Sequence, residues 1–301
     1  MLEHCKKTSI KKMHLGTMKS KTILIDTSIY LYKFVAEDAL LEHLYLMISI
    51  FRHYEIIPIF IFDGKPPAEK RQLLIQRRLE KRDAEEKYNE LKLALAGSPD
   101  NSDLLKELEL LKRQCISITF DHLQIAKDLM SAYGVQYICA DGEADVLCAQ
   151  MAANPNIWAC MSDDMDMFVY GCPRVLRQLS LMNHNIMFYD TNCVLEDLEM
   201  DLPTFREIAV LSGTDYMQES NHSLHKTMEL YKKYRVVESD LSFSEWLCHT
   251  GSYIKNREQF QHIVQMFQPV AVEMECPAVN LPVNMEKLKQ LMEPDGFIFV
   301  H

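Results

Sequence analysis

The chain has 301 residues, of which 48% are hydrophobic and 25% are charged, and its formal net charge is −11. These values are typical of a soluble globular protein with enough material for one large or two modest domains. The negative charge argues against a protein that coats nucleic acid non-specifically, although it leaves room for a local basic surface. No apolar run approaches the roughly 18 residues that a membrane span requires, so we expect no membrane contact.

The cysteines and the N-terminal residues say less about function. The nine cysteines form no C-x-x-C pair, and most lie among apolar neighbours, so we interpret them as reduced thiols of an intracellular protein. Residues 1–21 are rich in lysine, with Glu3 as the only acid. We expect this N-terminus to be solvated and mobile; a targeting segment is the alternative, although it would normally contain arginine.

Two short apolar segments predict neighbouring strands of a parallel sheet. Lys21–Ile25 leads into Asp26, Ile56–Phe62 leads into Asp63, and residues 29–51 between them have a helical pattern. This strand–helix–strand spacing is typical of a βαβ unit. Ligands of such sheets bind beyond the carboxyl ends of the strands, where both of these strands reach an aspartate.

A long charged segment follows, from Lys65 to Gln114. Leucines recur in it at helical spacing on both sides of Ala96–Ser102, which predicts two helices joined by a turn, with Ser102 as an N-cap. Between Lys65 and Arg82, seven Lys or Arg residues stand against two acids. A solvated helix face is the ordinary explanation, but in an acidic protein this basic helix favours contact with phosphate.

Two further strands also lead into acidic turns. A helix over Phe120–Tyr133, which Gly134 closes, precedes a strand over Val135–Ala140. That strand leads into Asp141–Asp145 and a helix that ends near Ala153. The next strand, Ile157–Met161, leads into the sequence SDDMD.

The remaining core elements are a β-hairpin and a helix. We expect the hairpin over Val175–Leu181 and Asn185–Tyr189, and the helix over Phe205–Leu211, which runs into Ser212–Tyr216. The chain has neither internal repeats nor a low-complexity linker.

The acids after the strands each have an ordinary explanation when taken alone. Asp26 could cap the helix that follows it, Asp63 could be a turn residue before glycine, and Glu143 and Asp145 could stabilise a helix N-terminus. Together they would oppose one another's ionisation unless hard cations bridged them, and oxygen ligands favour Mg²⁺ or Mn²⁺. Two such ions are the usual arrangement for in-line phosphodiester hydrolysis.

The SDDMD segment holds the densest acids. Asp164 and Asp166 are two positions apart just past a strand, so in extended geometry both would point to one side. We therefore expect them to bind one ion of a pair, with Asp163 as a solvated or supporting neighbour.

The chain resembles the flap endonuclease family of structure-specific 5′ nucleases. Five segments in the family's order carry the resemblance, which covers about residues 21–216: IDTSIYLY (Ile25–Tyr32), IFDGKPP (Ile61–Pro67), DGEADVLCA (Asp141–Ala149), SDDMDMFVYG (Ser162–Gly171) and LSGTDY (Leu211–Tyr216). It implies an α/β, PIN-like nuclease core with a mainly parallel sheet flanked by helices. An inserted helical arch over 64–118 and a small C-terminal helical DNA-binding region complete the expected fold. The expected parts are a variable basic N-terminus (1–20), the core (21–216), and a divergent helix-hairpin-helix-like region with a C-terminal wrap (217–301).

The resemblance also implies functional residues. Two Mg²⁺ ions, replaceable by Mn²⁺, would be held by Asp26, Asp63, Glu143, Asp145, Asp164, Asp166 and Asp215; Asp145 stands where cellular members usually have Glu. Lys70 and Arg77 would hold the scissile phosphate and stabilise charge in the transition state. Tyr32 would stack on the base beside the cut, with a plain core position as the alternative. Further DNA contacts are expected from Lys65, Arg71, Arg78, Lys226, Lys232 and Lys233.

Three features depart from the family pattern. The usual Met-Gly start is replaced by residues 1–18. The turn at 219–226 contains no glycine, so a monovalent-ion site of the kind that grips duplex DNA is not expected there. Gln261–Phe267 predicts an amphipathic helix, with the wrong pattern for binding a sliding clamp.

The sequence therefore predicts a divalent-metal-dependent 5′ nuclease. We expect a monomer that hydrolyses DNA at 5′ flaps or single-strand/duplex junctions, at a nuclear, viral or cytoplasmic site of DNA replication, repair or recombination. A 5′–3′ exonuclease or a junction resolvase of the same family is the alternative. Two other classes remain open: a Mg²⁺-dependent phosphatase with Asp26 as its nucleophile, and an inactive protein that binds DNA structures.

Overall fold

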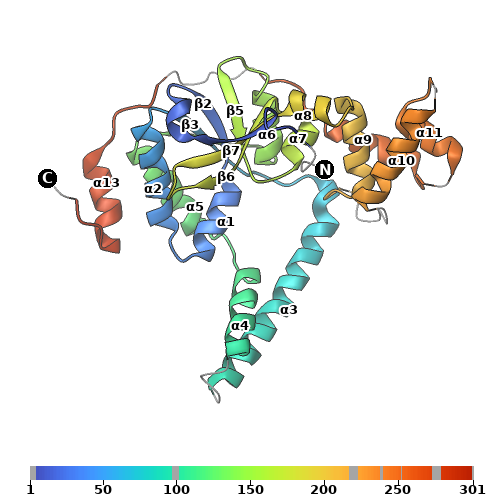
Figure 1. The fold of residues 1–301 in the computed structure, drawn as a ribbon. Coiled ribbons are helices and arrows are strands. Elements are labelled where there is room, and N and C mark those ends of the chain that lie inside the picture. Colours follow the sequence, from blue (N-terminus) through green and yellow to red (C-terminus); the bar gives the residue numbers. More distant parts are fainter. Residues whose placement is uncertain are drawn as a thin grey trace.

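A seven-stranded sheet with helices on both faces forms the body of the molecule (Figure 1). The computed structural model describes residues 5–96, 102–216, 223–237, 240–251, 253–272 and 279–299. The strand order is β1-β7-β6-β5-β2-β3-β4, in which β6, β5, β2, β3 and β4 run parallel while β7 is antiparallel to both β6 and β1. The strands are β1 Ile10–His14, β2 Thr22–Asp26, β3 Ile57–Phe62, β4 Gln136–Cys139, β5 Ile157–Met161, β6 Arg174–Ser180 and β7 Asn185–Asp190. The mainly parallel α/β fold expected from the sequence is confirmed.

The two faces of the sheet hold separate hydrophobic clusters. Alternate residues of a strand point to opposite faces, so Leu24 of β2 enters one cluster while Ile23 and Ile25 enter the other. The Leu24 cluster contains residues of α6 Ala144–Met151, α7 Asp166–Tyr170, α9 Leu202–Ser212, α10 Leu224–Val236, α11 Phe243–Thr250 and α12 Arg257–Met266. The other cluster contains residues of α1 Thr27–Ala36, α2 Leu40–His53, α5 Phe120–Ala132 and α13 Met285–Met292. Strands covered on both faces are buried along their whole length and mainly apolar, as β2 and β3 are.

Strand register places the acidic turns at one edge. In the β2–β3 pair Asp26 lies opposite Ile61, in the β3–β4 pair Phe62 lies opposite Cys139, and in the β2–β5 pair Ile25 lies opposite Met161. The four strands therefore end level with one another. The turns that follow them start at the same edge of the sheet.

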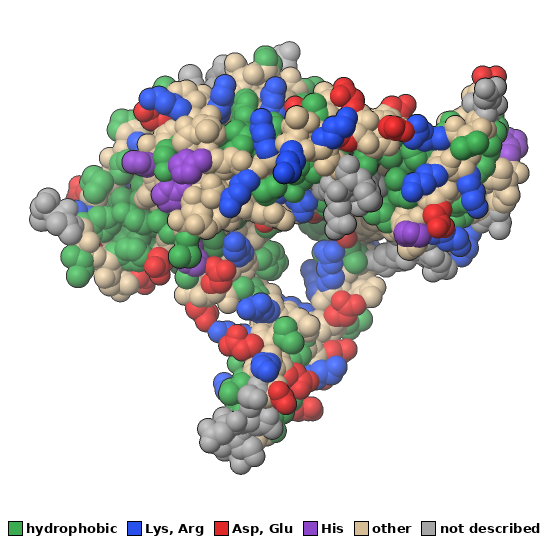
Figure 2. Space-filling view, viewed as in Figure 1, with side chains coloured by type: hydrophobic (Ala, Val, Ile, Leu, Met, Phe, Trp, Pro, Cys, Tyr) green, Lys and Arg blue, Asp and Glu red, His purple; other side chains and the backbone are tan. Residues whose placement is uncertain are grey.

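A pair of long helices projects from this body (Figure 1). The short 3₁₀ helix η3 Ala68–Lys70 leads into α3 Arg71–Ala96, and α4 Ser102–Gln114 returns. These are the two helices predicted within 65–114, while the predicted turn between them falls on residues 97–101, outside the described part of the chain. An open space bounded by the helix pair and the body is visible in Figure 2.

The N-terminal expectation is wrong for residues 10–18. β1 pairs with β7 along its whole length, and Leu15 and Met18 of the 3₁₀ helix η2 Leu15–Met18 are fully buried. Four apolar residues spaced among the lysines suffice to hold the segment on the sheet, with Lys11 and Lys12 left exposed on the edge strand. Such charged edges also block unwanted strand pairing.

The single helix expected over residues 29–51 is two helices. α1 ends at Ala36 and α2 starts at Leu40, and between them Asp38 adopts a left-handed conformation with φ 51°. Aspartate tolerates this conformation better than most residues, so the break occurs without a glycine or proline to mark it.

The remaining elements are α8 Thr191–Asp197 and the 3₁₀ helix η4 Glu293–Asp295. All eight cysteines in the described ranges are free, while Cys276 lies outside them. Within those same ranges, no helix combines the length and the apolar character needed to cross a bilayer.

Candidate active site

Asp26 ends β2 in a buried position and is held by a serine. The Ser162 hydroxyl, directly after β5, donates to Asp26 Oδ2 at 3.0 Å. The Asp26 side chain makes no capping hydrogen bond to α1, so the helix-cap explanation is wrong. Burial, followed by the charges of Asp63 and Asp145, raises the pKa of Asp26 to about 7.

Asp63 and the loop before α6 are joined backbone to backbone. The Gly64 amide donates to the Gly142 carbonyl at 2.7 Å, and Asp63 Oδ1 accepts from the Ala144 amide at 2.8 Å. A Cβ atom at Gly64 would lie 1.9 Å from the Ala140 carbonyl oxygen, so this approach requires glycine. The Ser28 hydroxyl, on the first turn of α1, donates to Asp63 Oδ2.

Glu143 and Asp145 lie at the start of α6, as expected. Glu143 is the N-cap residue, although its side chain makes no capping bond, and Asp145 is nearly buried in the first turn. Burial and the charge of Glu143 raise the pKa of Asp145 to about 7, against the lowering effects of Lys70 and the Val146 amide.

Asp164 and Asp166 differ from the expected extended geometry. Asp166 begins α7, and its amide donates to Asp164 Oδ1 at 3.0 Å, because the chain turns into a short helix that Gly171 closes with φ 86°. Burial and the charge of Asp164 raise the pKa of Asp166 to about 7. Asp163 is occupied elsewhere: its carboxylate accepts from the Gln178 amide of β6 at 2.6 Å.

Two basic residues at the foot of the arch contact these acids. The buried Lys70 ammonium donates to Glu143 Oε1 at 2.6 Å and lies 3.6 Å from Asp215 Oδ2. Arg77 Nη2 donates to both Asp215 oxygens, at 3.0 and 3.2 Å. Burial lowers the pKa of Lys70, but its bond to Glu143 and the neighbouring negative charges outweigh this, so its pKa lies above the ordinary value and it stays protonated.

An aromatic group completes the Lys70 environment. The Tyr216 hydroxyl donates to Glu143 Oε2 at 2.7 Å, and the Lys70 ammonium lies 4.7 Å from the centre of the Tyr216 ring. Phe267, which is fully buried, packs against both Tyr216 and Tyr170. The expected amphipathic helix at Gln261–Phe267 is present as the end of α12, with its aromatic residue directed into the body.

The other predicted DNA contacts lie on the surface. Tyr32 on α1 is 51% exposed, so the core alternative for it is wrong. Lys226 lies 5.9 Å from the Tyr253 ring centre at the start of α10. The six basic residues predicted to contact DNA are all exposed. They lie just before η3, on α3 and on α10: Lys65, Arg71, Arg78, Lys226, Lys232 and Lys233. Of the glycine-less turn expected at 219–226, residues 219–222 lie outside the described chain, while Ser223 is the N-cap of α10 and residues 224–226 form its first turn.

The acid set fits hard divalent cations. Asp26, Asp145 and Asp166 each have a pKa raised by burial and by other carboxylates, which is the signature of negative charge that lacks a counter-ion. Among the described residues no three acidic, His or Cys side chains are grouped so as to hold an ion as they stand. Lys70 and Arg77 contact oxygens of two of these acids, Glu143 and Asp215. Carboxylate oxygens are the donors that Mg²⁺ and Mn²⁺ prefer.

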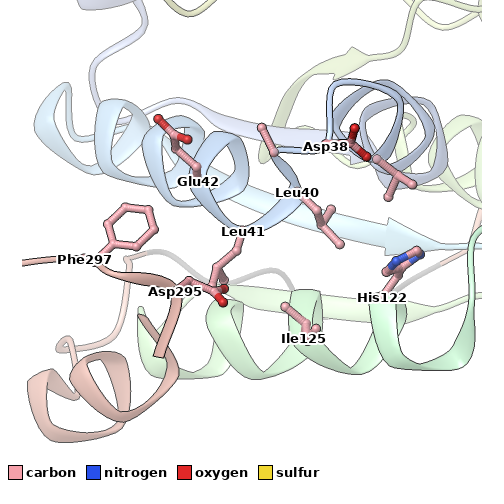
Figure 3. Close-up of a pocket in the computed structure, with 10 residues that line it drawn as sticks. Asp38, Leu40, Leu41, Glu42, His122, Ile125, Asp295 and Phe297 are labelled. Atoms are coloured by element: carbon pink, nitrogen blue, oxygen red, sulfur yellow. The ribbon is translucent and has the colours of Figure 1, made fainter. Parts of the chain in front are cut away.

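One cavity borders the acids, and another lies away from them. One, of about 620 Å³, borders Lys65, Glu143 and Tyr216 beside the acids. Another, of about 430 Å³, lies between the α1–α2 connection, α5 and the C-terminal segment, with Asp38, Glu42 and Asp295 around it (Figure 3). It contains none of the predicted site residues. Asp38 also receives Lys112 of α4 at 2.6 Å, so this second cavity adjoins the returning foot of the arch.

The residues that the sequence interpretation missed all support the predicted acids. They are the hydroxyl donors Ser28, Ser162 and Tyr216 and the close-packed Gly64. Each one lies inside a segment that already carried the resemblance, within two residues of a predicted ligand. A search for hydroxyls within two residues of the acids would therefore have found Ser28, Ser162 and Tyr216, but not Gly64.

Family models match two parts of the chain: the XPG N-terminal domain over residues 1–85 and the XPG I-region over residues 134–215. The chain belongs to the flap endonuclease family. Flap endonuclease 1-A of Sorghum bicolor is 30% identical over 249 residues, which cover 80% of this chain and 62% of that relative. Flap endonuclease 1 of Methanococcus aeolicus is 25% identical over 309 residues, covering 95% and 88%.

The fold of this family member also matches a solved structure. The catalytic core of Rad2 in complex with a DNA substrate aligns with a TM-score of 0.68 at 19% identity, covering 95% of this chain and 92% of that one. At this level of identity the match shows that the fold is shared and shows nothing about activity. The chain spans about 62% of the length of the sorghum relative, so activity must be argued from the site.

Proposed function

We propose that this chain is a divalent-metal-dependent, structure-specific 5′ nuclease that hydrolyses DNA phosphodiester bonds at 5′ flaps or single-strand/duplex junctions. One observation carries the proposal: two arch cations, Lys70 and Arg77, contact acids at the edge where four parallel strands deliver their carboxylates. Phosphatase chemistry on Asp26 needs neither the arch nor this number of acids. Binding without cleavage would be weakened by them, because they repel phosphate.

The chain's own residues supply binding and charge. Lys70 remains protonated, and Arg77 is 55% exposed, so both can donate to a phosphate that enters between α3 and the acids. In doing so they exchange carboxylate partners for phosphate oxygens, which are equally good acceptors. Their positive charge then lies where negative charge accumulates during hydrolysis.

Asp26, Asp63, Glu143, Asp145, Asp164, Asp166 and Asp215 would hold the cations, two Mg²⁺ or Mn²⁺ ions. Bound there, the ions would supply Lewis-acid activation of water and of the scissile phosphate. Tyr32, exposed on α1 directly after Asp26, offers a stacking surface for an unpaired base. Lys65, Arg71 and Arg78 at the arch, and Lys226, Lys232 and Lys233 on α10, supply phosphate contacts to the flanking DNA.

DNA with a 5′ single-strand/duplex junction is thus the proposed partner. This agrees with the DNA substrate named for the Rad2 core. The proposed division is a nuclease core over residues 21–216, with the arch over 64–118, followed by a DNA-gripping and wrapping region over 217–301. A monomer acting at a nuclear or viral site of DNA replication, repair or recombination completes the proposal.

Cleavage of four labelled DNAs tests the function. A 5′ flap, a nicked duplex, a blunt duplex and a four-way junction are each incubated with the protein in Mg²⁺ or in chelator. We expect Mg²⁺-dependent cleavage that is fastest at the flap. Absence of cleavage on all four DNAs, or cleavage that persists in chelator, contradicts the proposal.

Exonuclease action at nicks and gaps is the second candidate, because the open space bounded by the helix pair and the body (Figure 2) would admit a single strand in either reaction. The same gel separates the two, because an exonuclease releases mononucleotides from the nick whereas a flap endonuclease releases the intact flap. Preference for the four-way junction would instead identify a resolvase, as in the GEN1 structure with Holliday junction DNA.

A further inference from the structure

A fully buried hydroxyl connects the ends of two neighbouring strands at the acidic edge. Ser162 has no exposed surface, and its Oγ donates to Asp26 Oδ2 at 3.0 Å while accepting from the Asp164 amide at 3.1 Å. Its own amide donates to the Leu176 carbonyl of β6 at 3.1 Å. Ser162 is therefore fixed by β6, and it holds the end of β2 and the turn that follows β5.

We propose that Ser162 is a positioning residue for the metal ligands Asp26 and Asp164, an inference that rests on the proposed metal-dependent function. A serine hydroxyl has one proton to donate, and here that proton goes to Asp26. The hydroxyl's acceptor capacity serves the Asp164 amide. One side chain thereby sets the orientation of the Asp26 carboxylate and the direction in which the chain leaves β5 toward Asp164.

Asp26 depends on this hydroxyl more than the other acids depend on theirs. Ser28 also donates to Asp63, but Asp63 accepts the Ala144 amide as well. In the same way Glu143 accepts from both Tyr216 and Lys70. Among the described residues, Ser162 supplies the one hydrogen bond recorded to the Asp26 side chain.

Loss of the Ser162 hydroxyl should lower the affinity of the site for metal. A ligand that must find its binding orientation again loses affinity, and removal of outer hydrogen-bond partners typically weakens metal binding by about 10–100-fold. A purely structural serine would lower stability without changing metal affinity. The two roles therefore predict different results for the same substitution.

Mn²⁺ binding, measured by electron paramagnetic resonance of the full chain, distinguishes them. The variants are Ser162→Ala, which removes the hydroxyl; Ser162→Cys, which keeps the volume but donates weakly; and Ser162→Thr, which restores the hydroxyl. The matched control is Ser9→Ala, because Ser9 is also buried and donates to a carboxylate, Asp197, away from the acidic edge. Thermal unfolding of each variant identifies those that fold.

We expect Ser162→Ala and Ser162→Cys to raise the Kd for Mn²⁺ by about 10-fold or more, while Ser162→Thr and Ser9→Ala bind like the wild type. Wild-type affinity in the alanine and cysteine variants overturns the inference. So does an equal loss of affinity in Ser9→Ala, which would mark a general effect of instability. A wild-type protein that binds no Mn²⁺ overturns the metal site itself, and with it the proposed function, before Ser162 is considered.

Discussion

The acidic edge and the arch are neighbours that are held in place in different ways. At the edge, strand register, close backbone contacts and buried hydroxyls fix the acids. The arch is joined to the body largely by side chains, such as Lys112 to Asp38 and Arg77 to Asp215. Partly exposed ion pairs of this kind contribute little stability. The acids therefore lie on a part fixed by backbone contacts, whereas Arg77 reaches them through a partly exposed ion pair and Lys70 through a buried one.

The largest effect is expected at the ligands of the rigid edge. Asp164→Ala and Asp166→Ala should abolish Mg²⁺-dependent flap cleavage, because each removes a carboxylate that the ions require. Asp163→Ala is the matched control, since its carboxylate is already occupied by the Gln178 amide. Full activity in either of the first two variants, at saturating Mg²⁺, rules out the proposed assignment.

The arch cations come next. Lys70→Met and Arg77→Met should each lower kcat on flap DNA by about 100–1,000-fold, as removal of a transition-state donor typically does. Thermal unfolding should be nearly unchanged for Arg77→Met, whose side chain is the more exposed of the two. Lys87→Met, an exposed lysine farther along α3, is the control. Equal losses in all three variants would indicate non-specific electrostatics.

A glycine tests the backbone contact that joins two acidic loops. Gly64→Ala should lower the free energy of unfolding by about 1–3 kcal/mol, the usual cost of overpacking, because its Cβ would meet the Ala140 carbonyl oxygen. Activity should fall with it. Gly142→Ala, in the facing loop, has nothing within 4 Å of its new Cβ and should be close to neutral. Urea unfolding of both variants gives the comparison, and equal stabilities refute it.

The charge of the edge predicts how Mg²⁺ stabilises the protein at different pH. Asp26, Asp145 and Asp166 have pKa values near 7 when folded, against an ordinary 3.8, so between these values the folded state binds more protons than the unfolded state. Their contribution to stability is present at low pH and is lost as pH rises through 7. Mg²⁺ should therefore raise Tm more at pH 8 than at pH 5.5. An equal rise in Tm at the two pH values contradicts this. Asp145→Asn should make the rise at pH 8 more similar to the rise at pH 5.5.

The smallest effect is expected at the returning foot of the arch. Lys112→Ala removes a solvent-exposed contact to Asp38, so Tm should not change measurably. Limited proteolysis should instead cut within the arch faster. A clear fall in Tm would show that the arch is as firmly attached as the edge and would remove the contrast between them.

Local patterns in the sequence were enough to predict the elements at the edge. Apolar runs marked β2, β3 and β5, and the acids after them marked where the site lies. What escaped prediction depends on partners far away in the chain. β1 is a strand because β7 pairs with it, and the lysines around it concealed this. Asp166 begins a helix instead of continuing a strand, and Asp38 interrupts the helical segment between β2 and β3. Both depend on backbone conformations that composition does not signal.

The packing of Phe267 has a consequence for the order in which the site is made. Phe267 lies under Tyr216, whose hydroxyl holds Glu143, and Asp215 comes from the same late stretch of chain. During synthesis the N-terminal part of a protein emerges first. The early strands can therefore form their sheet long before the acid set is complete. All seven acids have emerged once Asp215 is made, but Phe267 follows them, so an incomplete product would carry the acids without the ring that packs against Tyr216.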